Sequence, residues 1–120
     1  MSESQSLGEK GENLAAEYLK KKGYIIRDRN WVSGKKELDI VAENNDFIVF
    51  VEVKTREFEK YKNTLPEENI TYSKLRKLNK IANAYLRLKN LEDEAYRFDA
   101  ISVWLSEITG EAKIKHIQSL

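Results

Sequence analysis

The chain has 120 residues, a net charge of +1 and 41% hydrophobic residues, which fits one domain spanning residues 1–120. It has no cysteine and one histidine, His116, so disulfide scaffolds, thiol nucleophiles and sites that need two histidines are excluded. No glycine pattern of a nucleotide-binding loop occurs. Any polar catalysis must therefore use carboxylates, lysines or a metal ion held by oxygen ligands.

No segment has the character of a signal peptide or a membrane span. The first ten residues are polar, and the longest apolar run, Phe47 to Val51, is far too short to cross a bilayer. We therefore expect a cytoplasmic protein without a membrane partner.

The sequence periodicity predicts, in chain order, a helix over 6–22, strands over 24–32, 37–42 and 47–54, a helix over 71–89, and strands over 96–105 and 112–117. Ser6 and Glu9 form a capping box at the start of the first helix, and Gly23 ends it. Pro66 and mixed charge indicate a mobile loop over 55–70. The order αβββαββ predicts an α/β domain, with a mixed central sheet of about five strands flanked by two main helices.

The alternation of residues 37–42 predicts that Leu38 and Ile40 share one face of their strand, with Glu37 and Asp39 on the other. The strand over 47–54 ends in Glu52-Val53-Lys54. The two strands are expected to form a hairpin, because Asn44-Asn45-Asp46 between them is a turn by composition.

Three acids and a lysine are expected to meet on one face of this hairpin. With Asn45-Asp46 as the turn, Asp39 lies opposite Glu52, and Glu37 lies opposite Lys54. With Asn44-Asn45 as the turn, Asp39 and Glu52 are diagonal neighbours on the same face. Opposed carboxylates repel, so Lys54 or a divalent cation must offset the charge. Such a cation beside a lysine can activate water for phosphodiester hydrolysis. An ordinary ion pair between Glu37 and Lys54, with solvated acids beside it, is equally compatible with the geometry.

Glu12 lies at the edge of the apolar stripe of the first helix and is expected to point toward the domain. It can reach the same acidic site, or it can bond a backbone amide at the rim.

The positive charge is concentrated in one part of the chain. Residues 54–90 carry ten basic and four acidic residues, whereas both flanking segments are acidic. Arg56, Lys74, Arg76 and Lys77 are the candidates to hold phosphates, with Lys74 and Lys77 placed largely off the apolar stripe of their helix. A solvated, lysine-rich helix is the other interpretation.

Four segments carry a resemblance to a known family: Gly11-Glu12, residues 37–41, residues 50–56 and Arg97-Phe98-Asp99. With them the sequence resembles, over nearly its whole length, the YraN-like family of small bacterial proteins. That family is similar to archaeal Holliday junction resolvases and belongs to the P-D-(D/E)-x-K nuclease superfamily. Leu38 stands where the superfamily pattern has proline.

The resemblance implies a restriction endonuclease-like core and a Mg²⁺ or Mn²⁺ cofactor. It implies Asp39, Glu52 and the Val53 backbone carbonyl as metal ligands, with Glu12 as a further acid of the metal site. Lys54 would help to activate the attacking water, and Glu37 matches a family glutamate just before the aspartate.

Together these expectations predict a metal-dependent endonuclease that acts on DNA rather than RNA, with branched or repair intermediates as substrates. A homodimer would suit a junction of two-fold symmetry, and a protein partner is compatible with this reading. The alternative is a non-catalytic nucleic-acid-binding or repair-accessory protein that keeps the nuclease fold. A protein-interaction module that uses residues 55–70 is a third hypothesis.

Overall fold

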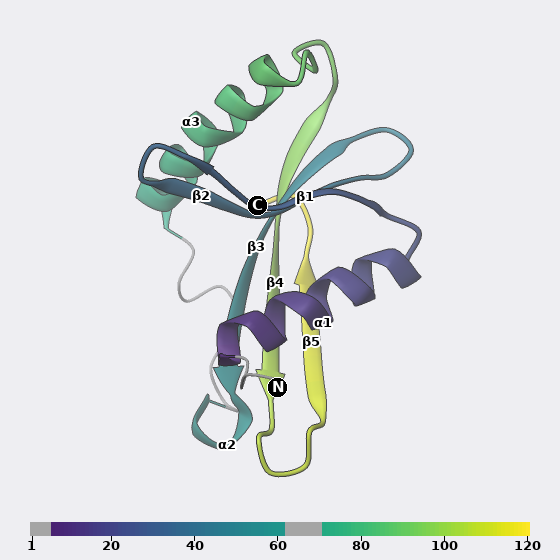
Figure 1. Ribbon diagram of the computed structural model, residues 1–120, viewed down its shortest axis with the longest axis vertical. Helices are drawn as coiled ribbons and strands as arrows, with labels where there is room; N and C mark the ends of the chain where they lie inside the picture. Colours follow the sequence, from purple (N-terminus) through teal and green to yellow (C-terminus); the bar gives the residue numbers. More distant parts are fainter. Residues whose placement is uncertain (1–5, 62–70) are drawn as a thin grey trace, which may run out of the picture.

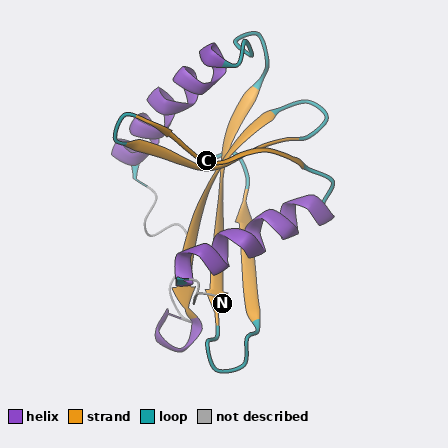
Figure 2. Cartoon of the chain, viewed as in Figure 1, coloured by secondary structure: helices purple, strands orange, loops and turns teal. Residues whose placement is uncertain are grey.

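The computed structural model describes residues 6–61 and 71–120 of the chain. Its elements in chain order are α1 (Leu7–Lys21), β1 (Ile25–Ser33), β2 (Lys36–Glu43), β3 (Ile48–Glu57), α2 (Phe58–Tyr61), α3 (Tyr72–Leu88), β4 (Tyr96–Leu105) and β5 (Ala112–Ile117) (Figure 2). All seven predicted helices and strands are present, with ends within three residues of the predicted ones.

The five strands form one mixed sheet in the order β1-β2-β3-β4-β5. Neighbouring strands are antiparallel except for β3 and β4, which are parallel and are joined through α3. Figure 1 shows the strong twist of this sheet, with α1 crossing β3, β4 and β5 and α3 lying at the end that holds β2. The predicted α/β domain with a mixed five-stranded sheet is confirmed.

The two main helices cover opposite faces of the sheet. Ala15, Ala16 and Leu19 of α1 pack on one face, against Val49 and Val51 of β3 and their neighbours. Residues Ile81, Ala82, Tyr85 and Leu86 of α3 pack on the other face, against Leu38, Val41, Ile48 and Phe50. Because β3 contributes to both clusters, it is the central strand of the hydrophobic core.

Local signals explain where α1 begins and ends. The Ser6 hydroxyl accepts a hydrogen bond from the Glu9 backbone N–H, and the Glu9 carboxylate accepts one from the Ser6 N–H. After the helix, Gly23 adopts φ +95°, a conformation that favours glycine. The predicted capping box and helix stop are therefore confirmed.

The loop predicted over 55–70 is partly wrong. Residues 55–57 continue β3, because β4 keeps pairing with them as far as Glu57 opposite Leu105. Residues 58–61 form α2, where the Glu59 carboxylate accepts a hydrogen bond from the Ser106 hydroxyl at 2.7 Å. The rest of the predicted loop, residues 62–70, lies outside the described residues.

The predicted faces of β2 are also wrong at one position. Ile40 packs with α1, but Leu38 packs on the α3 side beside Trp31. The ladder between β1 and β2 pairs Arg29 with Ile40 and Trp31 with Leu38. The residues between them, Asn30 (φ +52°) and Asp39, make no pair in that ladder. At this irregularity the side chains of β2 stop alternating regularly between the two faces of the sheet, so Leu38 and Ile40 lie on opposite faces.

A buried polar network ties the C-terminal strand to the sheet. Asp99 is fully buried and accepts hydrogen bonds from His116 Nε2 at 2.7 Å, Arg97 Nε at 3.0 Å and the Ser119 N–H at 3.0 Å. Burial alone raises the pKa of Asp99, but these donors outweigh it and leave the pKa below the usual value. The network has its partners satisfied, so its role is structural.

Within the described residues, none of the helices has the length and apolar character needed to cross a membrane.

Gly11 is where α1 approaches β3 most closely. A Cβ added there would lie 1.7 Å from Oγ1 of Thr55, which no packed structure tolerates. We expect Gly11→Ala to lower the free energy of unfolding by about 2 kcal/mol, because the helix must move away from β3. Chemical denaturation measures this change.

Gly8→Ala is the matched control, since a Cβ at Gly8 meets only the Ser6 hydroxyl at 4.0 Å. We expect it to leave stability unchanged or to raise it by about 0.5 kcal/mol through helix propensity. Equal effects of the two substitutions would contradict the close approach.

Candidate functional site

The candidate site lies where β2 and β3 stop pairing. Their ladder runs from Glu43 opposite Ile48 to Ile40 opposite Val51, the register predicted from a turn at Asn45-Asp46. The next pair in that register, Asp39 opposite Glu52, is the first one outside the ladder. β3 itself continues to Glu57 because it remains paired with β4. Beyond Val51, the backbone of β3 is therefore no longer paired with the backbone of β2.

Asp39 fills this gap with its side chain. Its Oδ2 accepts a hydrogen bond from the Val53 backbone N–H at 2.9 Å, in place of the missing strand neighbour. Burial and, to a smaller extent, the nearby acids Glu12, Glu52 and Glu37 raise the pKa of Asp39 to about 6, although the hydrogen bond from Val53 lowers it. The carboxylate therefore lies in an environment that disfavours its negative charge.

Glu52 meets two lysines. Its Oε2 lies 2.5 Å from Nζ of Lys74 on α3 and 4.0 Å from Nζ of Lys54. The Lys74 contact is an ion pair, and among the described residues the buried Oε2 has no further hydrogen-bond partner. Lys74 beside it is the main cause that lowers the pKa of Lys54, and burial contributes to the same shift. Asp39, Glu52, Lys54 and Lys74 thus form one group of charged side chains, which we call the charge cluster.

Glu12 approaches the cluster from α1. The absence of a side chain at Gly11 lets this helix pack against Thr55 of β3, one residue beyond Lys54. Glu12 also pairs with Arg29 of β1, with Oε1 and Nη2 3.7 Å apart. Glu12 is an electrostatic neighbour of Asp39, as the raised pKa of Asp39 records. The prediction that Glu12 points toward the domain agrees with this position.

Glu37 occupies a more peripheral place. It is exposed and pairs with Val32 of β1. Glu37 precedes the point where the β2–β3 ladder stops, so the predicted position opposite Lys54 falls outside the ladder. Glu37 contributes to the site as one of the acidic neighbours of Asp39.

The basic residues separate into two groups. Arg76 and Lys77 are exposed on α3, as a phosphate contact requires, and Arg56 is half-buried on β3. Lys74 is different, because it lies four residues before Leu78, on the stripe of α3 that faces the sheet. The prediction that Lys74 lies off this stripe is wrong. The spacing of Lys74, Leu78, Ile81 and Tyr85 was the signal that identifies it as a site residue.

Arg29 was not among the predicted site residues, although it pairs with Glu12 and donates a hydrogen bond to Asn13 Oδ1 at 2.8 Å. Its position follows from the pairing of β1 with β2, which the sequence pattern does not reveal.

The cluster is not a ready-made metal cage. Within residues 6–61 and 71–120, no three His, Cys, Asp or Glu side chains are grouped so that they could hold a metal ion. Asp39 and Glu52 are the two acids that the end of the β2–β3 ladder brings together, and Lys74 is the cation now in contact with Glu52.

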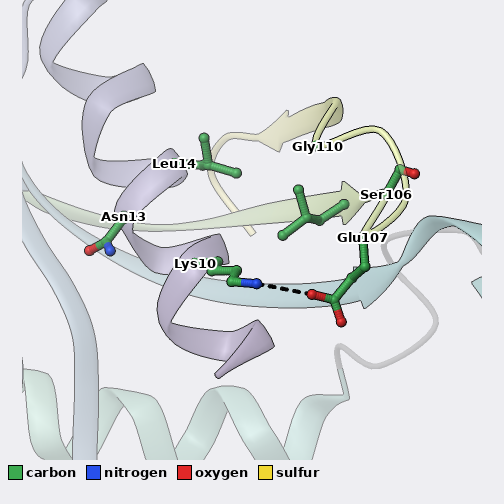
Figure 3. A pocket seen from close by; sticks show the side chains of 7 residues that line it. Lys10, Asn13, Leu14, Ser106, Glu107 and Gly110 are labelled. Carbon is green, nitrogen blue, oxygen red and sulfur yellow. Dashed lines mark hydrogen bonds and ion pairs between the residues drawn. The ribbon is translucent and has the colours of Figure 1, made fainter. Parts of the chain in front are cut away.

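A pocket of about 390 Å³ lies between α1 and the turn that joins β4 to β5 (Figure 3). Lys10 and Glu107 are bridged at 3.0 Å on its rim, and Leu14 and Leu105 line it with Asn13, Ser106 and Gly110. None of the acids of the charge cluster lines it. Among its lining residues, Asn13 accepts a hydrogen bond from Arg29, which also pairs with Glu12.

Comparison with known proteins places the chain in a family. The model of the uncharacterised protein family UPF0102 matches residues 11–103. The chain belongs to this family. It is 44% identical over 121 residues to a UPF0102 protein of Bacteroides thetaiotaomicron, covering 98% of this chain and 93% of the relative. It is 39% identical over 117 residues to one of Clostridium botulinum, covering 97% and 94%.

A third UPF0102 protein, from Phocaeicola vulgatus, is 47% identical over 103 residues, which cover 86% of this chain and 83% of the relative. These matches confirm the resemblance to a family of small bacterial proteins. The region matched to UPF0102 contains Glu12, Asp39, Glu52, Lys54 and Lys74, and so the complete charge cluster.

The raised pKa of Asp39 predicts a stability effect that depends on pH. Since its pKa is about 6 in the folded chain and 3.8 in the reference state, folding is weakened as pH rises through this window. We expect Asp39→Asn in metal-free buffer to raise the free energy of unfolding by about 2 kcal/mol at pH 7, with little gain near pH 4. The Asn oxygen can still accept from Val53.

Urea denaturation at the two pH values measures this difference. Asp46→Asn, in the exposed turn between β2 and β3, is the control and should change stability equally at both. A gain for Asp39→Asn of the same size at both pH values would contradict the charge-based explanation.

Proposed function

We propose that this UPF0102 protein is a metal-dependent endonuclease with a restriction endonuclease-like core, which hydrolyses phosphodiester bonds in DNA. The supporting observation is that Asp39, Glu52 and Lys54 meet at the open end of the β2–β3 ladder, next to Glu12. Branched or repair intermediates are the substrates that we expect.

The donor atoms fit a divalent cation. In the part of the chain that the structure describes, Oε2 of Glu52 is buried and contacts only lysine ammonium groups, while Asp39 accepts from Val53 through Oδ2 and can offer Oδ1 to a cation. Mg²⁺ and Mn²⁺ prefer such oxygen ligands, and Mg²⁺ is commonly held by one or two carboxylates together with waters and substrate phosphates. A two-carboxylate site agrees with the lack of a three-acid group among the described residues.

Asp39, Glu52 and the Val53 carbonyl are the groups that we propose to hold the ion, with Glu12 acting on its surroundings through charge. When bound, the ion would neutralise charge at the scissile phosphate and lower the pKa of a coordinated water. Lys54 is the residue that we propose to orient the attacking water and to take its proton at Nζ. In the free protein Lys74 and burial lower the pKa of Lys54, and a divalent ion beside Glu52 would act in the same direction, which favours the neutral amine that accepts a proton.

The surface of α3 offers contacts for the substrate backbone. Arg76 and Lys77 are exposed on the first turns of this helix, close in sequence to Lys74 of the charge cluster. We propose that they contact DNA phosphates, which position the substrate and carry no sequence information. Such contacts predict binding that weakens steeply with salt.

Cleavage of labelled linear, single-stranded and four-way-junction DNA in Mg²⁺ and in Mn²⁺ tests the proposal. We expect cutting by the wild type and a loss of at least about a hundredfold in Asp39→Asn, because one of two metal-binding carboxylates is removed. Asp46→Asn, purified in parallel, should cut like the wild type and excludes a contaminating nuclease.

Metal-independent, salt-sensitive DNA binding without cutting in either metal would contradict the nuclease and favour the accessory protein. In that case Asp39→Asn should preserve or strengthen binding, because it removes negative charge. DNA affinity that is insensitive to salt and unchanged in Lys77→Glu would contradict both nucleic-acid functions.

A further inference from the structure

We propose that Lys74 is the internal counter-ion of the metal site: its ammonium occupies the position beside Glu52 Oε2 that the divalent ion takes, and metal binding displaces it. This inference rests on the proposed function and assigns to Lys74 a role in controlling metal affinity. Lys74 is thus a positioning residue of the site rather than one more phosphate contact on the surface of α3.

The geometry of the contact carries the inference. Nζ of Lys74 lies 2.5 Å from Oε2 of Glu52, and the Glu52 side chain is only 12% exposed. Within residues 6–61 and 71–120, this ion pair is the closest contact of an oxygen that has no other hydrogen-bond partner. The ammonium is therefore held there by charge, in direct contact with the carboxylate oxygen. A cation can be exchanged at a buried carboxylate oxygen when charge holds it there and no network of further hydrogen bonds fixes it.

A divalent ion and the Lys74 ammonium are mutually exclusive at this oxygen. Lys54 Nζ already lies 4.0 Å from the same Oε2, so the cluster holds two ammonium groups near one carboxylate. Adding two further positive charges there would place three cations within a few ångströms, in surroundings that screen charge poorly. Of the two lysines, Lys74 makes the shorter contact and so is the one that must leave.

Lys74 is placed so that it can leave. It is the third residue after the helix cap Thr71, whose hydroxyl accepts from the Lys74 backbone N–H at 3.1 Å. That bond anchors the backbone and leaves the four-carbon side chain free to rotate, and 31% of the side chain already faces solvent. Lys54, by contrast, extends from the central strand, and its Nζ lies farther from the Glu52 oxygen, at 4.0 Å.

When a metal ion displaces it from Glu52, the Lys74 ammonium would take up a second position. With Glu52 bound to metal, the Lys74 ammonium would extend toward solvent on the side of α3 that carries Arg76 and Lys77. There it would meet the phosphate that accompanies the metal. Metal binding and substrate binding would thus be coupled through one side chain, with Lys74 opposing the metal in the free protein and favouring the phosphate in the complex.

Direct metal binding without DNA tests this inference. Mn²⁺ is titrated into wild type, Lys74→Gln, Lys74→Arg and Lys77→Gln, and free Mn²⁺ is followed by electron paramagnetic resonance. We expect Lys74→Gln to bind Mn²⁺ about tenfold more tightly, because the ion no longer competes with an ammonium. Lys74→Arg keeps the charge and should bind like the wild type. Lys77→Gln removes an exposed lysine from the same helix and is the matched control.

Thermal unfolding supplies a second readout. Without metal, Lys74→Gln should melt below the wild type, since Glu52 loses its nearest cation and a buried carboxylate is left unpaired. Saturating Mn²⁺ should raise its melting temperature by more than it raises that of the wild type. If Lys74 had a purely structural role, Lys74→Gln would melt at a lower temperature without metal, but Mn²⁺ would raise its melting temperature no more than that of the wild type.

Equal or weaker Mn²⁺ binding by Lys74→Gln, with normal binding by the wild type, would overturn the inference and leave the metal site intact. Asp39→Asn separates this from failure of the proposed function. If the wild type binds no Mn²⁺ at millimolar concentration, or binds it no better than Asp39→Asn, the metal-dependent function fails, and the inference fails with it.

Discussion

The unequal pairing of β3 is the constraint on which the candidate site depends. β3 pairs with β4 along its full length, from Ile48 to Glu57, but with β2 only as far as Val51. A strand whose backbone is satisfied on one side and free on the other must find another acceptor for its N–H groups. Asp39 supplies that acceptor for Val53, and this single bond brings the aspartate next to Glu52 and Lys54.

The price of this arrangement is a concentration of like charge. Asp39 is disfavoured as an anion by burial and by three acidic neighbours, and within the described residues the buried Glu52 oxygen contacts only lysine ammonium groups. Clusters that weaken the fold in this way are found where a ligand or a reaction relieves them. Lys74 and Lys54 relieve part of the charge, and a divalent ion would relieve more of it.

Asp99 is a second buried carboxylate, and its surroundings shift its pKa in the opposite direction to that of Asp39. Asp99 is also buried and also belongs to a charged cluster, but His116, Arg97 and the Ser119 N–H satisfy its oxygens. Its pKa is lowered, whereas that of Asp39 is raised. One carboxylate is therefore part of what stabilises the fold, and the other is kept in place by a fold that its charge weakens.

Local sequence was sufficient for the elements and for much of the hairpin. The capping box at Ser6 and Glu9 and the glycine stop at Gly23 act within a few residues, so they are readable without tertiary contacts. The register of β2 and β3 followed from the turn between them, because a short turn leaves few alternatives. The pair of Asp39 with Glu52 falls just outside the observed ladder, where Glu52 is an electrostatic neighbour of Asp39.

Other features depended on contacts between distant segments. The end of the β2–β3 ladder, the change of face at Leu38 and the continuation of β3 through Thr55 are set by pairing with β1 and β4. Lys74 reaches Glu52 only because α3 packs across the sheet, and Glu12 reaches Asp39 only because Gly11 lets α1 touch Thr55. Residue types and spacing carry the chemistry of this site, but its assembly requires the packing of two helices on opposite faces of one strand.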